Sequence, residues 1–306
     1  MNTPQLAAYG MLGLPLAMAA LPIYIHAPKL YGDNFGLGLA LTGFILLGSR
    51  AVDTLQDPWL GRLADYLQHR RGGWRLLMIS AAVLLVLAYA ALFNPPSRDP
   101  AALAIWLAVS LVVVYTAHSA LTITYLSWGA RASEDTLERT RLVAFREAFS
   151  LAGVILASLL PMLLTAWLDI ELGWLLFSLL FAALTLPALW LLLQRVPMPQ
   201  PLQTPSTDIL QPLRHPPFRR LAALFLLNGL AMAIAATLAL FYIADVLQLE
   251  SSSGIFLAIY FVSGALSLPL WLLFARRVNK TVLWLAGSIM AVAAFVWAVQ
   301  LGAGDL

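Results

Sequence analysis

Residues 76–93 read LLMISAAVLLVLAYAALF, an apolar run without a single charged residue. About 18 or more such residues form an α-helix long enough to cross the hydrocarbon core of a bilayer. In lipid there is no water to bond the backbone N–H and C=O groups, so a spanning segment must satisfy them within a helix. The stretch therefore predicts a transmembrane α-helix.

Runs of the same kind continue through most of the 306 residues. Hydrophobic residues make up 61% of the chain and charged residues 11%, and the mean hydropathy is +0.84. A soluble fold of this size cannot bury that much apolar surface, and the lack of Cys excludes a disulfide-stapled domain or a zinc ribbon. We predict an all-α, polytopic membrane protein whose nine spans lie at about 4–25, 36–58, 75–93, 101–129, 142–168, 173–194, 220–244, 253–275 and 281–301.

The basic residues predict the orientation of these spans. Fifteen of the 18 Lys and Arg residues fall in or beside alternate connections, whereas the other connections hold only Lys29 and Arg98, and Arg50 lies inside a span. Because cytoplasmic loops carry the excess of Lys and Arg, we expect a cytoplasmic N-terminus in a bacterial inner membrane. The pI near 9.3 then reflects topology and not nucleic-acid binding.

A proline-rich stretch divides the chain. We expect a six-helix bundle at 1–194, a cytoplasmic linker at 195–217 and a partial bundle of three helices at 218–306. The segment PWLGR (58–62) is weakly echoed by PLW (269–271) followed by two arginines, an offset of six helices. Such an offset is typical of transporters with two parallel six-helix repeats, and we expect three helices of the second repeat to be missing.

The span GFILLGSRAVDTLQDPWLG (43–61) carries charges that are costly in a membrane. At 100° per residue, Arg50, Asp53 and Asp57 share one helix face. Each ionised side chain costs about 2.5–3.5 kcal/mol at mid-membrane, so such residues mark functional sites. The alternative is a structural Arg50–Asp53 ion pair, which leaves Asp57 unexplained.

A proline follows directly after Asp57. Pro58 has no N–H, so the carbonyl of Thr54 loses its helical partner and becomes a free oxygen ligand. Two carboxylates and a carbonyl form a hard-oxygen site for Na⁺ or Li⁺, or a pair of carboxyls that takes up a proton.

Two blocks of sequence resemble a known family. RAVDTLQDPWLGRLAD (50–65) and TYLSWGARASEDTLERTRLVAFREAFSLAG (124–153) are similar to the melibiose-permease-like glycoside–pentoside–hexuronide:cation symporters of the major facilitator superfamily. The resemblance implies the major facilitator fold, a six-helix bundle followed here by an incomplete second one. It also implies symport driven by a coupling ion, with no cofactor.

The resemblance carries residues over by position. It implies that Asp53 and Asp57 bind the cation and that Gln56 and Ser119 contribute ligands. It also implies that Arg146 lines the substrate cavity, although an interfacial arginine paired with Glu147 is an equal alternative. The aspartates with which melibiose-type proteins hold sugar hydroxyls are replaced by about Ala17 and Thr122, which weakens a galactoside assignment.

A polar stripe runs along the segment 101–129. His118, Thr122 and Tyr125 recur at helical spacing, with Trp128 nearby, and they either face a cavity or pack between helices. We include all four, with Arg50, among the candidate substrate-binding residues.

The first arginine-rich connection has two interpretations. Arg62, Asp65, Arg70 and Arg71 either set the topology alone or form a cytoplasmic latch between the bundles, as the resemblance implies.

No nucleophile–base pair, P-loop or Cys/His metal pattern is present, so we do not expect an enzyme. The leading hypothesis is a monomeric symporter in the lipid bilayer that couples Na⁺, Li⁺ or H⁺ to a glycoside or other small-molecule substrate. One alternative is transport of a lysophospholipid or other amphipathic substrate, which the uncharged first span favours. Another is a truncated membrane protein that does not transport.

Overall fold

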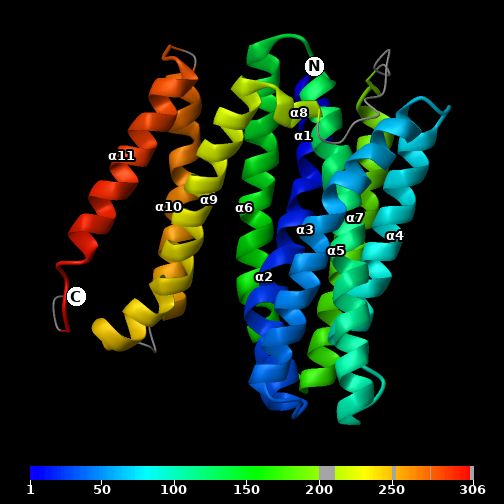
Figure 1. The fold of residues 1–306 in the computed structure, drawn as a ribbon, viewed down its shortest axis with the longest axis vertical. Coiled ribbons are helices and arrows are strands. Elements are labelled where there is room, and N and C mark those ends of the chain that lie inside the picture. The colour runs from blue at the N-terminus through cyan, green and yellow to red at the C-terminus, as the bar shows by residue number, and fades with distance from the viewer. Residues whose placement is uncertain (200–210, 250–252, 276, 304–306) are drawn as a thin grey trace. The chain divides into compact units, whose positions relative to one another are not determined.

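A computed structural model gives the fold and describes residues 1–199, 211–249, 253–275 and 277–303 (Figure 1). Within these ranges the chain forms helices and loops and contains no strand, which confirms the predicted all-α class. The chain divides into two compact units, Met1–Thr207 and Asp208–Leu306. The division falls inside the predicted linker at 195–217, of which 200–210 lie outside the described residues.

The helices of the first unit match the predicted spans but differ at their ends. The first predicted span is divided near Leu12, and the helix predicted at 36–58 continues ten residues further with Pro58 inside it. The elements are α1 (Thr3–Met11), α2 (Gly13–Lys29), the π-helix η1 (Leu30–Asn34), α3 (Leu39–Gln68), α4 (Gly73–Phe93), α5 (Pro100–Arg131), α6 (Thr136–Trp167) and α7 (Ile170–Arg195).

The second unit is also helical where it is described. It contains α8 (Gln211–Arg214), α9 (Pro216–Phe241), the π-helix η2 (Tyr242–Val246), α10 (Ser253–Ala275) and α11 (Lys280–Ala298).

Three of the longest helices begin at an aspartate. Asp99, Asp135 and Asp169 precede α5, α6 and α7, and each side chain accepts a hydrogen bond from a backbone N–H of the first turn. A capping side chain satisfies one of the N–H groups that have no partner at a helix start. The cap at Asp135 explains why α6 begins six residues before the predicted span at 142–168.

Six helical segments of the described residues are long and apolar enough to cross a membrane. They are Thr3–Asn34, Gly73–Phe93, Pro100–Arg131, Thr136–Trp167, Ile170–Arg195 and Thr281–Ala298. α3 is not among them, because its charged residues lower its hydropathy. The chain is therefore a multi-pass membrane protein.

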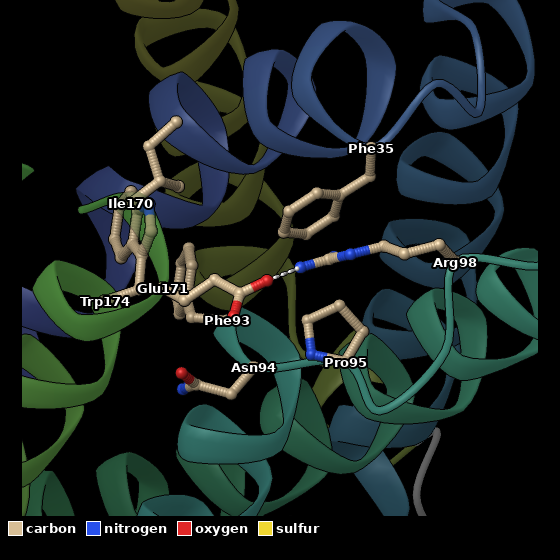
Figure 2. Close-up of a pocket in the computed structure, with 8 residues that line it drawn as sticks. All are labelled: Phe35, Phe93, Asn94, Pro95, Arg98, Ile170, Glu171 and Trp174. Atoms are coloured by element: carbon tan, nitrogen blue, oxygen red, sulfur yellow. Dashed lines mark hydrogen bonds and ion pairs between the residues drawn. The ribbon is translucent and has the colours of Figure 1, made fainter.

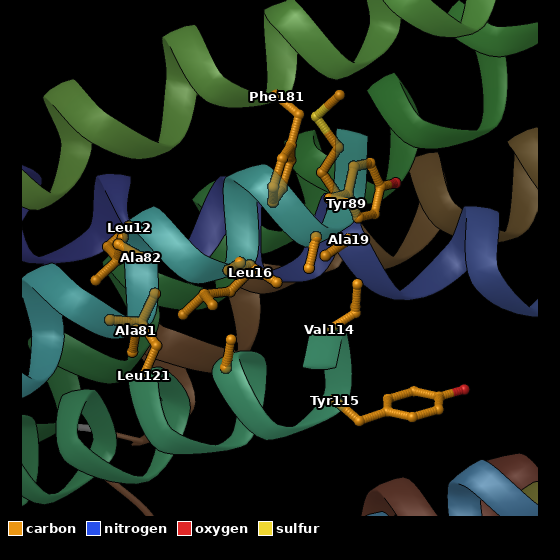
Figure 3. Packing of buried hydrophobic residues seen from close by; sticks show 14 of the residues in the cluster. Leu12, Leu16, Ala19, Ala81, Ala82, Tyr89, Val114, Tyr115, Leu121 and Phe181 are labelled. Carbon is orange, nitrogen blue, oxygen red and sulfur yellow. The ribbon is translucent and has the colours of Figure 1, made fainter. Parts of the chain in front are cut away.

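The core of the first unit lies where α2, α4, α5 and α7 meet. Leu12, Leu16, Ala81 and Ala82 belong to this core, and the ring of Phe181 in α7 stacks on that of Tyr89 in α4 with centroids 4.3 Å apart (Figure 3). Small residues let the helix backbones come close, as is typical of membrane helix packing. Figure 3 also shows the ring of Tyr115 directed away from Ala81 and Ala82, toward the side on which α3 packs against α5.

The two π-helices have the same local geometry. In each, backbone N–H groups bond to carbonyls five and six residues back, and the chain then takes a positive φ, at Gly36 (76°) after η1 and at Gln248 (58°) after η2. Both turns follow the first long helix of their unit. This shared geometry agrees with the sequence echo that predicted two related repeats.

A cavity of about 100 Å³ lies in the first unit (Figure 2). It lies at the end of the helices opposite to the connection between α3 and α4 (Figure 1). Arg98, before α5, donates to Glu171 at the start of α7 over 2.8 Å, and its guanidinium carbon lies 3.6 Å from the ring centroid of Phe35. Face-to-face stacking of Phe93 on Trp174, with centroids 4.4 Å apart, forms an adjacent wall. Arg98, which lies between α4 and α5, thus contacts Phe35 in the connection before α3 and Glu171 at the start of α7.

We expect Arg98→Ala to destabilise the protein more than Glu171→Gln does. The ion pair is exposed, with side-chain exposures of 42% for Arg98 and 79% for Glu171, and contributes about 0.2–1 kcal/mol. The alanine variant also loses the cation–π contact with Phe35, about 0.5–1 kcal/mol. Thermal unfolding in detergent compares the two variants, and an equal loss of stability in both would show that the ring contributes nothing.

Candidate cation and substrate sites

The buried carboxylate of Asp53 is the centre of the candidate cation site. It lies on α3 facing α5, and its side chain is 7% exposed. Its Oδ2 accepts a hydrogen bond from Nη1 of Arg50 over 2.8 Å. Its Oδ1 accepts bonds from Oγ of Ser119 over 3.0 Å and from Nε2 of Gln56 over 3.4 Å. The structure thus brings together four of the predicted residues, three from α3 and one from α5.

A further residue of α5 extends this network. The hydroxyl of Thr116 lies 2.9 Å from Oε1 of Gln56 and 2.7 Å from the carbonyl of Val112. Sequence reasoning missed Thr116, although its position three residues before Ser119 places both hydroxyls on one helix face.

Asp57 differs from Asp53 in having a free acceptor. Its Oδ1 is buried and has no hydrogen-bond partner among the described residues. A buried carboxylate oxygen without a partner is costly, since a buried charge needs a counter-charge or a proton. Asp57 therefore supplies the negative charge that remains after Asp53 has paired with Arg50.

The predicted ligand at Thr54 is its backbone carbonyl. Its hydroxyl donates to the carbonyl of Arg50 over 3.0 Å, so its side chain is already engaged. Pro58 lies inside α3 and has no N–H to offer the Thr54 carbonyl. That carbonyl oxygen is the ligand the sequence predicted.

The chemistry of this set suits a hard monovalent cation or a proton. Carboxylate, hydroxyl, amide and carbonyl oxygens are the ligands such cations prefer. Within the described ranges, no group of three or more His, Cys, Asp or Glu side chains is placed to hold a metal ion, which is the pattern of a transition-metal site.

The guanidinium of Arg50 lies close to two aromatic rings. Its carbon is 5.6 Å from the ring centroid of Tyr24 and 5.4 Å from that of Tyr115. Both distances are within the range of cation–π attraction. Sequence reasoning placed Arg50 in the site but not the two tyrosines, which come from α2 and α5.

Arg146 of α6 forms an ion pair with the neighbouring Glu147. This is the contact expected of the interfacial alternative. Its stem also packs beside Gly13, where α1 gives way to α2. Its side chain remains 24% exposed, so the group also stays available to a ligand.

The four residues of the polar stripe on α5 have two kinds of surroundings, one for His118 and Thr122 and another for Tyr125 and Trp128. His118 Nε2 lies 3.1 Å from the carbonyl of Leu16, and the buried hydroxyl of Thr122 has no partner among the described residues. Tyr125 stacks on Tyr9 with centroids 4.5 Å apart, and Trp128 Nε1 donates to the carbonyl of Pro197 over 2.9 Å. The placement of Tyr125 and Trp128 favours the helix-packing alternative.

The residues of the predicted latch lie at the end of α3 and just beyond it. Arg62 and Arg71 are exposed, and Arg70 hydrogen-bonds the Tyr66 hydroxyl. Asp65 forms no ion pair with any residue in the described part of the chain. The latch therefore stays a prediction.

The fold and the charged site together define a class: a multi-pass helical membrane protein with a buried aspartate and a partly buried one on the same helix. Residues 6–306 match the family described as "MFS/sugar transport protein". The chain belongs to this family, whose members are transporters and not enzymes, and this confirms the family that the sequence blocks indicated.

Individual relatives agree with this placement. The "Inner membrane symporter YicJ" of Escherichia coli is 23% identical over 88% of this chain and 60% of its own length. The "Putative glycoside/cation symporter YagG" of the same bacterium is 25% identical over 40% of this chain and 27% of its own length. An "uncharacterized symporter" of Synechocystis is 28% identical over 81% of this chain and 44% of its own length. The chain thus spans less than two thirds of the length of each of these relatives.

Proposed function

We propose that this protein is a symporter that couples the movement of Na⁺, Li⁺ or H⁺ to the transport of a small organic solute, a glycoside or sugar, by alternating access. The observation that carries the proposal is the buried carboxylate of Asp53, paired with Arg50, and the partly buried Asp57, whose buried Oδ1 has no partner among the described residues. Relatives named as symporters support it.

The mechanism follows from charge. Arg50, Asp53 and Asp57 carry one net negative charge, which one monovalent cation or one proton neutralises. Binding lowers the cost of the buried carboxylates and stabilises the conformation that accepts substrate. Coupling of this kind is reciprocal, so substrate tightens cation binding by the same factor. The coupling ion is itself transported, and no cofactor is needed.

The substrate site is proposed from the polar residues of the first unit. Arg146 and His118 supply polar groups, Thr122 supplies a hydroxyl that has no partner among the described residues, and Arg50 is a further donor. Tyr125 and Trp128 belong to the predicted set, but their contacts favour packing between helices. We propose, further, that the units 1–194 and 218–306 belong to the two repeats of an inner-membrane protein with a cytoplasmic N-terminus. Arg62, Asp65, Arg70 and Arg71 then form the cytoplasmic latch.

Vesicles reconstituted with the protein test the assignment. Imposed gradients of Na⁺, Li⁺ or H⁺ are expected to drive uptake of a radiolabelled methyl glycoside. Competition by lysophosphatidylcholine tests the amphipathic alternative. Lack of stimulation by all three ions would contradict symport and favour a membrane protein that does not transport.

Asp57→Asn is expected to abolish Na⁺ binding and cation-driven uptake while the protein stays folded and inserted. The substituted oxygen makes no hydrogen bond to a described residue, so its loss removes charge without removing a structural contact. Calorimetric titration with NaCl and size-exclusion chromatography in detergent measure the two properties. Unchanged Na⁺ binding in this variant would overturn the assignment of Asp57.

A further inference from the structure

We propose that Arg50 is a tethered counter-ion that competes with the coupling cation for Asp53, and that the rings of Tyr24 and Tyr115 hold it in the competing position. This inference rests on the proposed function. It adds two residues that set the affinity for the cation without contacting the cation itself.

The first observation is the unequal environment of the ion pair. The side chain of Asp53 is 7% exposed, whereas that of Arg50 is 52% exposed. Oδ1 of Asp53 is already occupied by two donors, Ser119 and Gln56, and Oδ2 by Arg50. A cation that coordinates Asp53 must therefore share Oδ2 with the guanidinium or displace it, and the two positive charges repel each other.

The second observation concerns what holds Arg50 in place. A long arginine side chain that is half exposed loses conformational entropy when it is fixed in one ion pair. Here the two tyrosine rings lie 5.6 and 5.4 Å from the guanidinium carbon, from two different helices. Their attraction offsets that loss and stabilises the cation-free state, in which Arg50 occupies Asp53.

The sign of the effect follows. Removing a ring weakens the competing state, so the cation binds more tightly. A cation–π contact of about 0.5–1 kcal/mol corresponds to a decrease in the Na⁺ dissociation constant of about two- to five-fold. Tyr24→Leu is the first variant to test, because Tyr24 is 51% exposed and its replacement leaves no buried cavity.

Tyr66→Leu is the matched control. Tyr66 is 52% exposed, and its ring lies 4.8 Å from the guanidinium carbon of Arg70, near the end of the same α3 that carries Asp53. Both substitutions remove a tyrosine ring and its cation–π contact, and Tyr66→Leu also removes the hydrogen bond that the Tyr66 hydroxyl accepts from Arg70. Only the ring of Tyr24 contacts the arginine that is paired with Asp53.

The experiment is a calorimetric titration of the full chain in detergent with NaCl, at constant ionic strength kept with choline chloride. Tyr24→Leu is expected to lower the Na⁺ dissociation constant two- to five-fold, and Arg50→Gln to lower it further. Tyr66→Leu is expected to leave it unchanged. In the Arg50→Gln background, Tyr24→Leu is expected to have no further effect, because no guanidinium remains for the ring to hold.

The outcomes separate this inference from the proposed function. If the wild-type chain binds neither Na⁺ nor Li⁺ and shows no H⁺-driven uptake, the proposed function fails and the inference fails with it. If the wild type binds Na⁺ and Asp57→Asn does not, but Tyr24→Leu leaves the affinity unchanged or weakens it, the function stands and the competition is disproved. An equal effect of Tyr24→Leu with and without Arg50 would also disprove it.

Discussion

Asp53→Asn is expected to weaken Na⁺ binding by about 30- to 5,000-fold and to abolish cation-driven uptake. Removing one partner of a buried, hydrogen-bonded charge pair costs about 2–5 kcal/mol, and each 1.4 kcal/mol corresponds to a factor of ten. In the proposed site this pair is the Asp53 carboxylate and the bound Na⁺, and the asparagine also leaves the positive charge of Arg50 beside the site without its counter-charge. Calorimetric titration with NaCl and vesicle uptake measure the two effects.

Asp53→Asn also differs from Asp57→Asn in its effect on folding. The asparagine leaves Arg50 without its ion pair, so we expect a lower melting temperature, whereas Asp57→Asn is expected to melt like the wild type. Asp33→Asn is the control, since Asp33 is an exposed carboxylate in η1. Wild-type affinity in Asp53→Asn would show that the carboxylate is a structural partner of Arg50 only.

Gly153→Ala is expected to destabilise the first unit by about 1–3 kcal/mol, the usual cost of overpacking a close-packed interior. A Cβ at Gly153 of α6 would lie 2.1 Å from the carbonyl oxygen of Leu14 in α2, closer than any real contact. One turn away, the Ser150 hydroxyl donates to the Gly13 carbonyl over 3.2 Å. The two backbones must separate to admit the methyl group, and this hydrogen bond is strained with them.

A second glycine provides the comparison for this prediction. Gly48 lies inside α3, and a Cβ added there meets no atom within 4 Å. Gly48→Ala is therefore expected to be neutral or slightly stabilising, because alanine favours the helix by about 0.5–1 kcal/mol. Thermal unfolding in detergent compares the two alanine variants, and equal melting temperatures would contradict the close approach of α2 and α6.

Much of the fold could be predicted because hydropathy acts locally. A run such as 76–93 must form a helix wherever it lies in the bilayer, and α4 covers it. The ends of helices were less predictable, because caps and amphipathic extensions decide them. α3 continues past Pro58 to Gln68, and Trp74 donates to the carbonyl of Ala64 over 2.7 Å, so tertiary contacts support a segment that hydropathy does not.

The candidate site was predictable only along a single helix. Spacing of three and four residues places Arg50, Asp53 and Asp57 on one face of α3, and this follows from helix geometry alone. Ser119 was predicted from the resemblance to a family and not from helix geometry. The sequence did not predict that Tyr24, Tyr115 and Thr116 lie at the site. Their positions depend on which faces of α2 and α5 meet α3.

The sequence by itself determined the class of protein, the helices and the charged face of α3, because bilayer solvation and helical periodicity are local constraints. Only the tertiary structure decided that both oxygens of Asp53 accept hydrogen bonds while Oδ1 of Asp57 has no partner among the described residues. It also decided that two rings from other helices lie 5.6 and 5.4 Å from the Arg50 guanidinium. Such pairings depend on close packing between distant segments, where a shift of a few ångströms exchanges one partner for another. Helix periodicity contains no information about that distance.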